Sequence, residues 1–290
     1  MSRRTAAEWA TRVPAPEPLV DVLIGTVGRT AELAVTLAGL AAQDDPPFRV
    51  LVSDQSDTHP AATDPAVQAM FRVLEAQGRQ PRLVRHRPRR GIAEHRDFLL
   101  RQATADAVLF LDDDVWLEPG ALQRLHEALT TLGCGFVGMA PQGLSYLDDR
   151  RPQEQQPFER WDGPVRPERI RRGEPGFERW TLHNAANLAH VAADQADPAR
   201  GWVPYRIAWV GACVLYRRSA LVECGGFGFW SDLPPAHAGE DVVAQWRVME
   251  RYGAAGLLPS GAVHLEAPTT IPHREVDAPD VVFAADRLAG

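Results

Sequence analysis

Residues 109–120 read LFLDDDVWLEPG, an apolar run that ends in three consecutive carboxylates. The apolar part, Leu109–Leu111, is suited to a buried strand. Asp112, Asp113 and Asp114 repel one another, and burying any of them without a partner costs free energy. The triplet therefore indicates either a strand end that holds a positive group or an acidic turn that caps the next helix.

The composition limits the classes of protein to be considered. The chain has 290 residues, of which 45% are hydrophobic and 24% charged, and its formal net charge is −7. The negative charge argues against a general nucleic-acid surface. No apolar run approaches the roughly 18 residues of a membrane span, the N-terminus lacks a signal-peptide core, and the three cysteines lack zinc-site spacing. We therefore expect a cytoplasmic protein with no nucleic-acid partner and no transmembrane segment.

Short apolar runs alternate with segments of helical periodicity from residue 19 onward. The expected strands are Leu19–Ile24, Phe48–Val52, Leu83–Val84 and Ala107–Leu111. The expected helices are Thr30–Ala42, Asp64–Gln77 and Ile92–Ala103. This alternation predicts an α/β fold whose mostly parallel sheet carries helices on both faces. Such sheets bind ligands at the carboxyl ends of their strands, where Asp54 and the aspartate triplet lie.

The chain changes character after residue 140. Residues 141–206 are rich in Pro, Arg, Gln and Asp, with Trp161, Trp180 and Trp202 among them. Long loops of this composition are usually functional or disordered. Regular structure is expected again as a strand at Ile207–Tyr216, a short helix at Arg218–Cys224 and a helix at Gly239–Tyr252.

The aspartate triplet has a direct chemical interpretation. Carboxylates at a strand end suit Mg²⁺ or Mn²⁺, because both ions prefer oxygen ligands. Mg²⁺ usually takes one or two carboxylates and completes its shell with water and substrate phosphates. Asp112 and Asp114 form an Asp-x-Asp pair that can present two carboxylates on one side of the backbone. In a parallel sheet this pair would hold a metal where a nucleotide diphosphate lies.

Five segments occur in an order that is typical of one enzyme family. They are residues 22–57 (VLIGTVGRT through VLVSDQSD), GIAEHRD at 91–97, DDD at 112–114, WVGAC at 209–213 with GGF at 225–227, and GED at 239–241. Together they resemble the motifs of family 2 glycosyltransferases. The usual opening, V-I-P-T-Y-N-R followed by V-D-D-G-S, is altered here at Gly25, Val27, Gly28 and Ser53.

The resemblance implies a GT-A fold. Residues 19–140 would be the half that binds the nucleotide sugar, 141–290 the acceptor-binding and catalytic half, and 1–18 a flexible leader. Thr26 and Arg29 would line the base and phosphates, and Asp54 would accept a hydrogen bond from the base or else form an Asx turn. Arg96 would pair with the diphosphate or with Asp112.

The resemblance also implies a metal site for Mn²⁺ or Mg²⁺. Asp114 would be the main ligand, and Asp112 would reach the ribose or the metal and its bound water. Asp113 would point away and hold the loop, still near the nucleotide. His264 would be a third ligand, with His273 as its weaker competitor.

For catalysis, the resemblance points to Asp241 as the base that takes the proton of the acceptor hydroxyl, and to Glu240 as the residue that positions it. The alternative is that both carboxylates only cap a helix. The expected reaction is transfer, with inversion, from a nucleotide-diphospho-sugar, most often a UDP-sugar in the family, to a glycan, lipid-linked or small-molecule hydroxyl.

Two other functions remain open at this stage. One is sugar-nucleotide nucleotidyl transfer, which also uses metal-bound carboxylates on an α/β sheet. The other is a degenerate protein that binds nucleotide sugars without catalysis, which the altered opening motif keeps in consideration. The Arg-rich stretch 79–90 is expected to be a solvated edge, although it could also draw the protein to anionic lipids.

Overall fold

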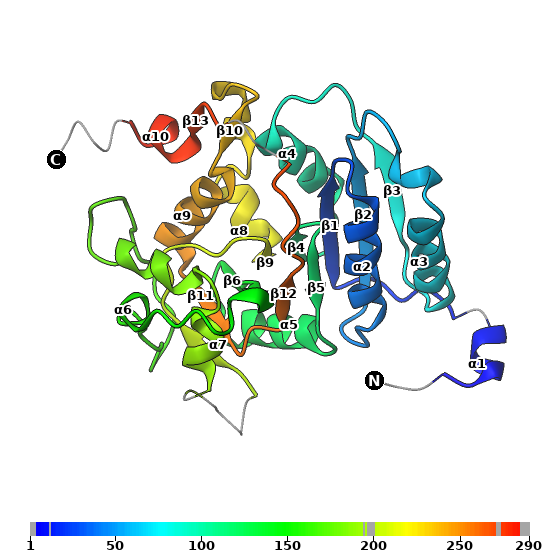
Figure 1. Ribbon diagram of the computed structural model, residues 1–290, viewed down its shortest axis with the longest axis horizontal. Coiled ribbons are helices and arrows are strands. Elements are labelled where there is room, and N and C mark those ends of the chain that lie inside the picture. The colour runs from blue at the N-terminus through cyan, green and yellow to red at the C-terminus, as the bar shows by residue number, and fades with distance from the viewer. Residues whose placement is uncertain (1–3, 12, 194, 196–200, 271–273, 285–290) are drawn as a thin grey trace.

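The computed structural model describes residues 4–11, 13–193, 195, 201–270 and 274–284. Its central sheet contains β1 (Val20–Thr26), β2 (Phe48–Asp54), β3 (Arg82–Arg85), β4 (Ala107–Leu111), β6 (Phe136–Gly138), β8 (Val203–Tyr205), β9 (Cys213–Arg217) and β11 (Ala254–Leu258). Their order across the sheet is β3-β2-β1-β4-β9-β6-β11-β8 (Figure 1). Strands from both halves expected from the sequence thus belong to one sheet.

The four strands β3, β2, β1 and β4 run parallel. Thr26 of β1 pairs with Asp54 of β2, and Asp54 pairs with Arg85 of β3, while β4 pairs with β1 from Ala107 to Phe110. Because parallel strands end at the same edge of a sheet, this register brings the segments that follow Thr26, Asp54 and Leu111 to one place.

The strand β9 is antiparallel to both of its neighbours, β4 and β6. It connects the parallel half of the sheet to the later strands, which include the parallel pair β6–β11 and the antiparallel pair β11–β8. The expected mostly parallel sheet is therefore confirmed, with antiparallel strands added in its second half.

Helices cover both faces, as the sequence predicts. The helices α2 (Thr30–Ala41), α3 (Pro65–Ala76) and α5 (Ala121–Leu132) pack on one face, and α4 (Ile92–Gln102), α8 (Arg218–Glu223) and α9 (Glu240–Tyr252) pack on the other. Side chains alternate along β1, so Val22 and Ile24 join the first core and Leu23 joins the second. Each such fully buried side chain contributes about 1.5–3 kcal/mol.

The expected strand at Ile207–Tyr216 is only half right, because β9 begins at Cys213. The reason is the buried side chain of Gln245 on α9. Its Oε1 accepts from the backbone N–H of Val210 at 2.7 Å, and its Nε2 donates to the Val210 carbonyl at 2.7 Å. The amide thus satisfies the backbone groups that a neighbouring strand would otherwise pair.

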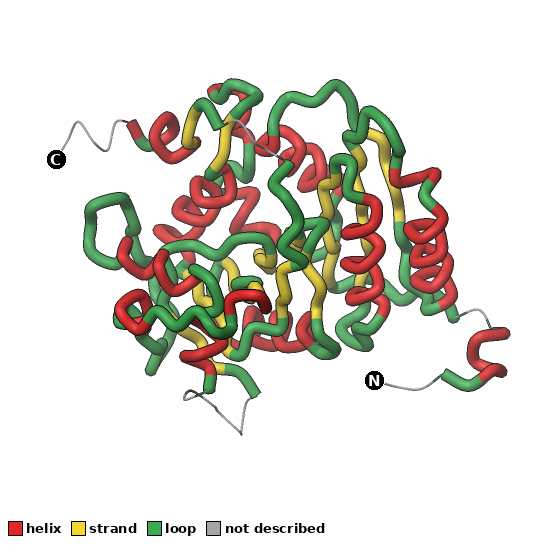
Figure 2. The backbone as a smooth tube through the Cα atoms, in the orientation of Figure 1, coloured by secondary structure: helices red, strands yellow, loops and turns green. Residues whose placement is uncertain are grey.

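Residues 141–206 contain more regular structure than their composition predicts, although loops make up most of the described segment. In their described parts they form β7 (Gln142–Gly143), η2 (Leu144–Tyr146), α6 (Pro152–Gln155), η3 (Phe177–His183), α7 (Asn187–Ala192) and β8. Figure 2 shows these short elements joined by loops. Trp161 and Trp202 are buried, and Arg206 lies over the Trp161 ring at 3.8 Å. Two of the three tryptophans therefore pack in the protein interior.

The remaining elements are small. They are α1 (Ala6–Ala10), η1 (Ala61–Thr63), β5 (Val115–Leu117), η4 (Gly228–Asp232), β10 (His237–Ala238), β12 (Ala262–His264), β13 (Val276–Asp277) and α10 (Ala278–Val282). The short helix α1 lies inside the predicted leader, where Arg4 donates to the Ala76 carbonyl. Among the described residues, the helices are too short or too polar to cross a bilayer.

Replacing the buried amide of Gln245 tests the packing of this region. Gln245→Leu leaves the N–H and C=O of Val210 without partners, so we expect the free energy of unfolding to fall by about 2–6 kcal/mol. Urea denaturation measures it. Gln123→Leu, on the exposed side of α5, is the control and should change stability by no more than about 0.5 kcal/mol. A Gln245→Leu variant as stable as the control would contradict this role.

Candidate active site

A cavity of about 370 Å³ lies at the carboxyl ends of β1, β2 and β4. Val27, Arg29, Gln55, Arg96, Asp112 and Asp113 are among the residues that line it. These residues come from the segments after β1, β2 and β4 and from α4. The cavity therefore occupies the ligand position expected for a parallel sheet.

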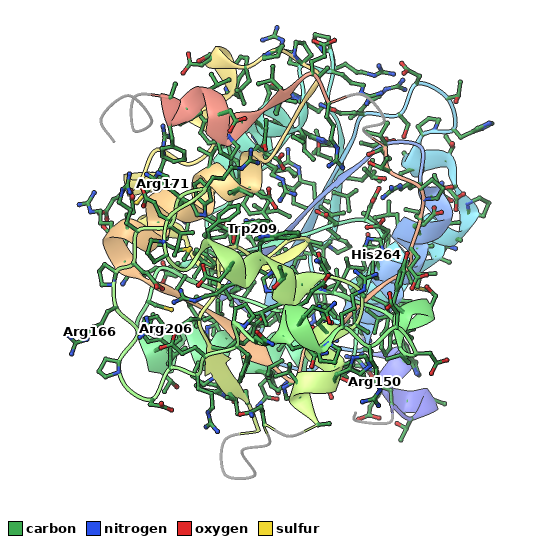
Figure 3. The ribbon with its side chains drawn as sticks, turned by 60° about the vertical axis from the view of Figure 1, so that its left-hand side comes forward. Arg150, Arg166, Arg171, Arg206, Trp209 and His264 are labelled. Carbon is green, nitrogen blue, oxygen red and sulfur yellow. The ribbon has the colours of Figure 1, made fainter. Side chains whose placement is uncertain are left out.

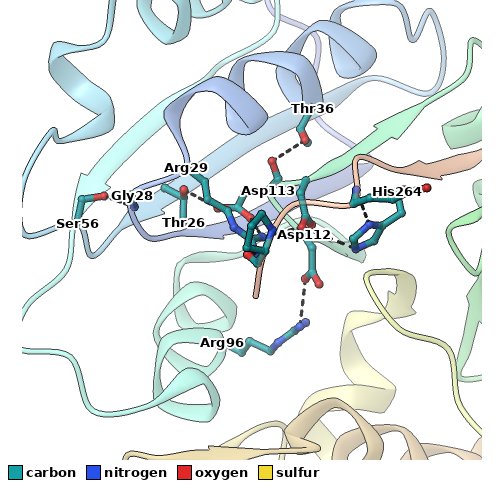
Figure 4. Close-up of polar contacts among 12 residues, drawn as sticks. Thr26, Gly28, Arg29, Thr36, Ser56, Arg96, Asp112, Asp113 and His264 are labelled. Atoms are coloured by element: carbon teal, nitrogen blue, oxygen red, sulfur yellow. Dashed lines mark hydrogen bonds and ion pairs between the residues drawn. The ribbon is translucent and has the colours of Figure 1, made fainter. Parts of the chain in front are cut away.

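Arg29 explains how two of the three aspartates are held (Figure 4). Its Nη1 lies 3.1 Å from Asp113 Oδ1 and 2.7 Å from Asp114 Oδ2. Its Nη2 donates to the Pro268 carbonyl. Thr26 Oγ1 donates to Asp113 Oδ2 at 2.7 Å, so the ends of β1 and β4 are joined. In this structure the positive group in the aspartate cluster is a guanidinium.

The environment of the cluster raises the pKa of its buried carboxyls. Burial raises the pKa of Asp113 to about 7, although the Thr26 hydrogen bond and Arg29 act in the opposite direction. Burial also raises the pKa of Asp114, against the charge of Arg29. Asp113 does hold the loop as expected, but it lines the cavity and does not point away from it.

Arg96 connects the aspartate triplet to the start of α9. Its Nη2 lies 3.2 Å from Asp112 Oδ1, and its Nε lies 2.8 Å from Glu240 Oε1. Burial alone would lower the pKa of Arg96, but the carboxylates of Glu240 and Asp112 outweigh it and raise that pKa. The expected pairing of Arg96 with Asp112 is present, and the ion pair with Glu240 is an addition that the sequence did not predict.

Glu240 and Asp241 form the first turn of α9. The preceding Gly239 has φ +77°, and a Cβ there would lie 2.3 Å from Asp277 Oδ1, so this position requires glycine. The Asp241 carboxylate accepts from the Val242 N–H at 2.9 Å. The helix-cap alternative expected a helix that starts at Val242, but α9 already begins at Glu240 and its N-cap is Gly239. Burial and then the charge of Glu240 raise the pKa of Asp241 to about 7, with Arg96 opposing.

Asp241 also opens onto a second cavity, of about 400 Å³. Three aromatic side chains, Phe177, Trp209 and Trp246, line it together with Arg172. The rings of Phe177 and Trp209 are 5.7 Å apart, and Trp209 is labelled in Figure 3. The Arg96–Glu240 ion pair thus links the linings of the two cavities, because Arg96 lines the first and Asp241, the neighbour of Glu240 in the sequence, lines the second.

The carboxylates of Asp112 and Asp114 suit a metal ion better than the ring of His264 does. Asp112 and Asp114 supply the oxygen donors that Mg²⁺ and Mn²⁺ prefer. His264 Nε2 lies 3.7 Å from Asp114 Oδ2, but its Nδ1 accepts from the Glu266 N–H at 2.7 Å. A neutral ring held in this way carries its proton on Nε2, so that atom has no lone pair for a metal.

Within the described ranges, no three His, Cys, Asp or Glu side chains form a group that could hold a metal ion. Arg29 occupies the space beside Asp114 that a cation would take. His273, the competing ligand expected from the sequence, lies outside the described residues. Of the expected ligands, the carboxylates of Asp112 and Asp114 are therefore the ones that suit a metal ion.

Asp54 has the local role that the sequence left as an alternative. One carboxylate oxygen accepts from the Ser56 N–H at 2.8 Å and the other from the Ala61 N–H at 2.8 Å. The side chain is buried. The Ser56 contact is an Asx turn. Because Asp54 is buried by these contacts and is not among the residues that line the cavity, the structure does not support the expected hydrogen bond from a base to Asp54.

Two histidines that the sequence did not single out shape the site. His237 Nε2 accepts from the Ala93 N–H at 3.1 Å, and its Nδ1 donates to the Pro234 carbonyl. It thereby ties the first turn of α4 to the segment that leads into α9. His95 lines the first cavity and bonds to Ser53 Oγ at 2.7 Å. The contact between His95 and Ser53 could have been suspected from the sequence, because Ser53 stands where the family motif usually has Asp.

Comparison with known proteins agrees with this geometry. The model of the family "Glycosyl transferase family 2" matches residues 21–192. The chain belongs to glycosyl transferase family 2. The resemblance drawn from its motifs is therefore confirmed. No curated protein matches the sequence.

Solved structures of glycosyltransferases share its fold. A mannosyltransferase from Pyrobaculum calidifontis, PcManGT, in complex with GDP-Man and Mn²⁺, matches with 19% identity and a TM-score of 0.56 over 92% of this chain and 64% of that chain. Residues 1–349 of S. aureus TarS in complex with UDP-GlcNAc match with 15% identity and a TM-score of 0.55, over 93% and 64%. The GT-A fold expected from the sequence is confirmed, and the chain spans less than two thirds of these structures.

Removing the connecting cation should destabilise the family 2 core. Arg96→Met leaves Glu240 buried without a partner, so we expect the free energy of unfolding at pH 7.5 to fall by about 3–5 kcal/mol. The loss should shrink as the pH is lowered to 5, because burial raises the pKa of Glu240 and a buried carboxyl that has lost its cation is protonated more readily. Urea denaturation at both pH values measures this. Arg101→Met, on the exposed side of α4, should cost no more than about 0.5 kcal/mol. Equal losses in the two variants would rule out the role of Arg96.

Proposed function

We propose that the chain is an inverting, metal-dependent glycosyltransferase that moves a sugar from a nucleotide-diphospho-sugar to an acceptor hydroxyl. The observation that carries the proposal is the arrangement of two cavities around the Arg96–Glu240 bridge, with Asp241 open to the second one. The first cavity suits the donor, because it lies at the strand ends and contains Arg29, Arg96 and Asp112. The second suits the acceptor.

Donor binding follows from the charges of the first cavity. Arg96 is placed to hold the diphosphate while it keeps Asp112 and Glu240 in position. Asp112 and Asp114 would hold Mn²⁺ or Mg²⁺, with Arg29 leaving Asp114. His264 would join them only after its Nδ1 gives up the Glu266 N–H. When bound, the ion supplies a Lewis acid for the departing diphosphate. PcManGT, which has Mn²⁺ in its complex, supports this proposal.

Asp241 is the proposed base. The acceptor oxygen attacks the anomeric carbon as its proton passes to the Asp241 carboxylate. The bond from that carbon to the diphosphate oxygen breaks, and the nucleoside diphosphate leaves from the opposite face, so the configuration inverts. A base with a pKa of about 7 is well matched to reaction near neutral pH. Glu240 is held by Arg96 and positions Asp241.

The donor is proposed to be a UDP-sugar, with GDP- and dTDP-sugars as the competing choices. The complexes of TarS with UDP-GlcNAc and of PcManGT with GDP-Man support a nucleotide sugar of this kind. The acceptor is proposed to be a hydroxyl of a glycan, a lipid-linked molecule or a small molecule, and Trp209 offers a ring face on which a sugar could stack.

Nucleotidyl transfer is less well supported. It would need free cations in the loop after β1, and the basic residue there, Arg29, is already paired with Asp113 and Asp114.

Asp241→Asn tests the base. The variant keeps the shape of the side chain but cannot accept the proton, so transfer should fall by about 10² to 10⁴, while the affinity for donor with Mn²⁺ stays unchanged. Glu240→Gln is the matched control and should lose less. In the wild type, the rate should decline as the pH falls below about 7, because Asp241 is then protonated. If Asp241→Asn transfers sugar at the wild-type rate, Asp241 is not the base.

The metal assignment has its own test. Asp114→Asn should abolish the Mn²⁺-dependent part of UDP binding in calorimetry, because it removes a charged oxygen ligand. His264→Ala should retain most of that part, since Nε2 carries the ring proton in this structure. If His264→Ala loses more of the Mn²⁺-dependent binding than Asp114→Asn does, the ring turns to bind the ion. If the affinity of the wild type for UDP is the same with and without Mn²⁺, there is no metal site.

A further inference from the structure

The side chain of Gln55 lies in the wall of the first cavity with its amide nitrogen unpartnered. Gln55 is 3% exposed, and its Nε2 is buried without a hydrogen-bond partner among the described residues. Its backbone N–H donates to the Thr26 carbonyl at 3.0 Å, which fixes the residue between β1 and β2. A buried donor without an acceptor is destabilising, and such a group in a native fold calls for a physical reason.

The other polar side chains in this turn are already committed. Ser53 bonds to His95, and Asp54 accepts from two backbone N–H groups. Ser56 Oγ accepts from the Gly28 N–H at 2.8 Å. Of the side chains of residues 53–56 in the described structure, Gln55 is therefore the one with a buried polar atom that lacks a partner.

The cavity has two chemically different ends. Arg96 and Arg29 pair with the aspartates that follow β4, whereas Gln55 directly follows the end of β2. The strand β1 separates β2 from β4, so the ends are about 10 Å apart at the usual strand spacing. A nucleoside diphosphate has the same polarity, with charged phosphates at one end and a flat, uncharged base at the other.

We propose that Gln55 reads the nucleobase of the donor, with its Nε2 donating to a ring carbonyl oxygen and its Oε1 accepting the adjacent ring N–H. Bases with this edge are uracil, thymine and guanine, and adenine lacks the carbonyl. The proposal rests on the donor cavity of the proposed function. It assigns base recognition to a neutral amide, because the Asp54 carboxylate is occupied by the backbone.

Gln55→Met tests this with two readouts that move in opposite directions. The thioether fills the same space without a buried donor, so the melting temperature of the ligand-free protein should rise by about 2 °C. The affinity for UDP, measured by calorimetry with Mn²⁺, should fall about 10- to 100-fold, because the base loses its partner. Affinity for inorganic pyrophosphate should stay within about twofold. A merely structural role of Gln55 would lower both the melting temperature and all affinities.

The control is Gln77→Met. Gln77 also has a buried, unpartnered amide atom, its Oε1, but its Nε2 donates to the Ala41 carbonyl and it does not line the cavity. This variant should lose thermal stability and keep the wild-type affinity for UDP. Gln55→Asn, which keeps the amide but shortens the side chain by one methylene, should fold like the wild type and lose affinity for UDP in the same way as Gln55→Met.

Three outcomes would overturn the proposal, and they are distinguishable. If both Gln55 variants bind UDP, GDP and dTDP as the wild type does, Gln55 does not read the base, while the proposed function stands. If ADP binds the wild type as tightly as the best of these three, the class of base is wrong. If the wild type binds no nucleoside diphosphate, the proposed function itself fails and the reading of the base fails with it.

Discussion

The ion pairs of Arg96 are the interaction on which the site depends. One guanidinium holds Asp112, which follows β4, and Glu240, which opens α9. These carboxylates are 128 positions apart in the sequence, and each belongs to a different half of the molecule. Because a buried charge without a partner is costly, neither segment can move from the cation without penalty. The position of Asp241 relative to the first cavity is therefore determined by Arg96.

A second cation, Arg29, completes the charge balance on the other side of the triplet. It pairs with Asp113 and Asp114, and Arg96 pairs with Asp112, so all three carboxylates have a positive partner in this structure. The question raised by LFLDDDVWLEPG is answered by these two guanidiniums. The same arrangement limits metal binding, because an ion at Asp114 has to replace an existing partner and gains only the difference between the two interactions.

The N-terminal half could be predicted closely from the sequence, because its strands and helices are defined by local periodicity. The predicted helix Thr30–Ala42 and strand Ala107–Leu111 agree with α2 and β4 within one residue. Contacts between distant residues could not be predicted in this way. The strand expected at Ile207 fails because of Gln245 on another element, and the function of Asp54 depends on where the Ala61 N–H lies. Local patterns carry no information on such partners.

The departures from the family motif are consistent with one another, which argues against a degenerate site. A Cβ at Gly25 would lie 3.0 Å from both Cε1 and Nδ1 of His95, so the missing side chain makes room for the imidazole. Ser53 then supplies a hydroxyl that bonds to the same ring. Burial lowers the pKa of His95 to about 3, so the ring is neutral at physiological pH. Random loss of function would not be expected to produce two substitutions that fit a third residue. Gly25, Gln55 and the neutral ring of His95 thus give this part of the cavity wall an uncharged surface beside Arg89, which suits an uncharged ligand group such as a base.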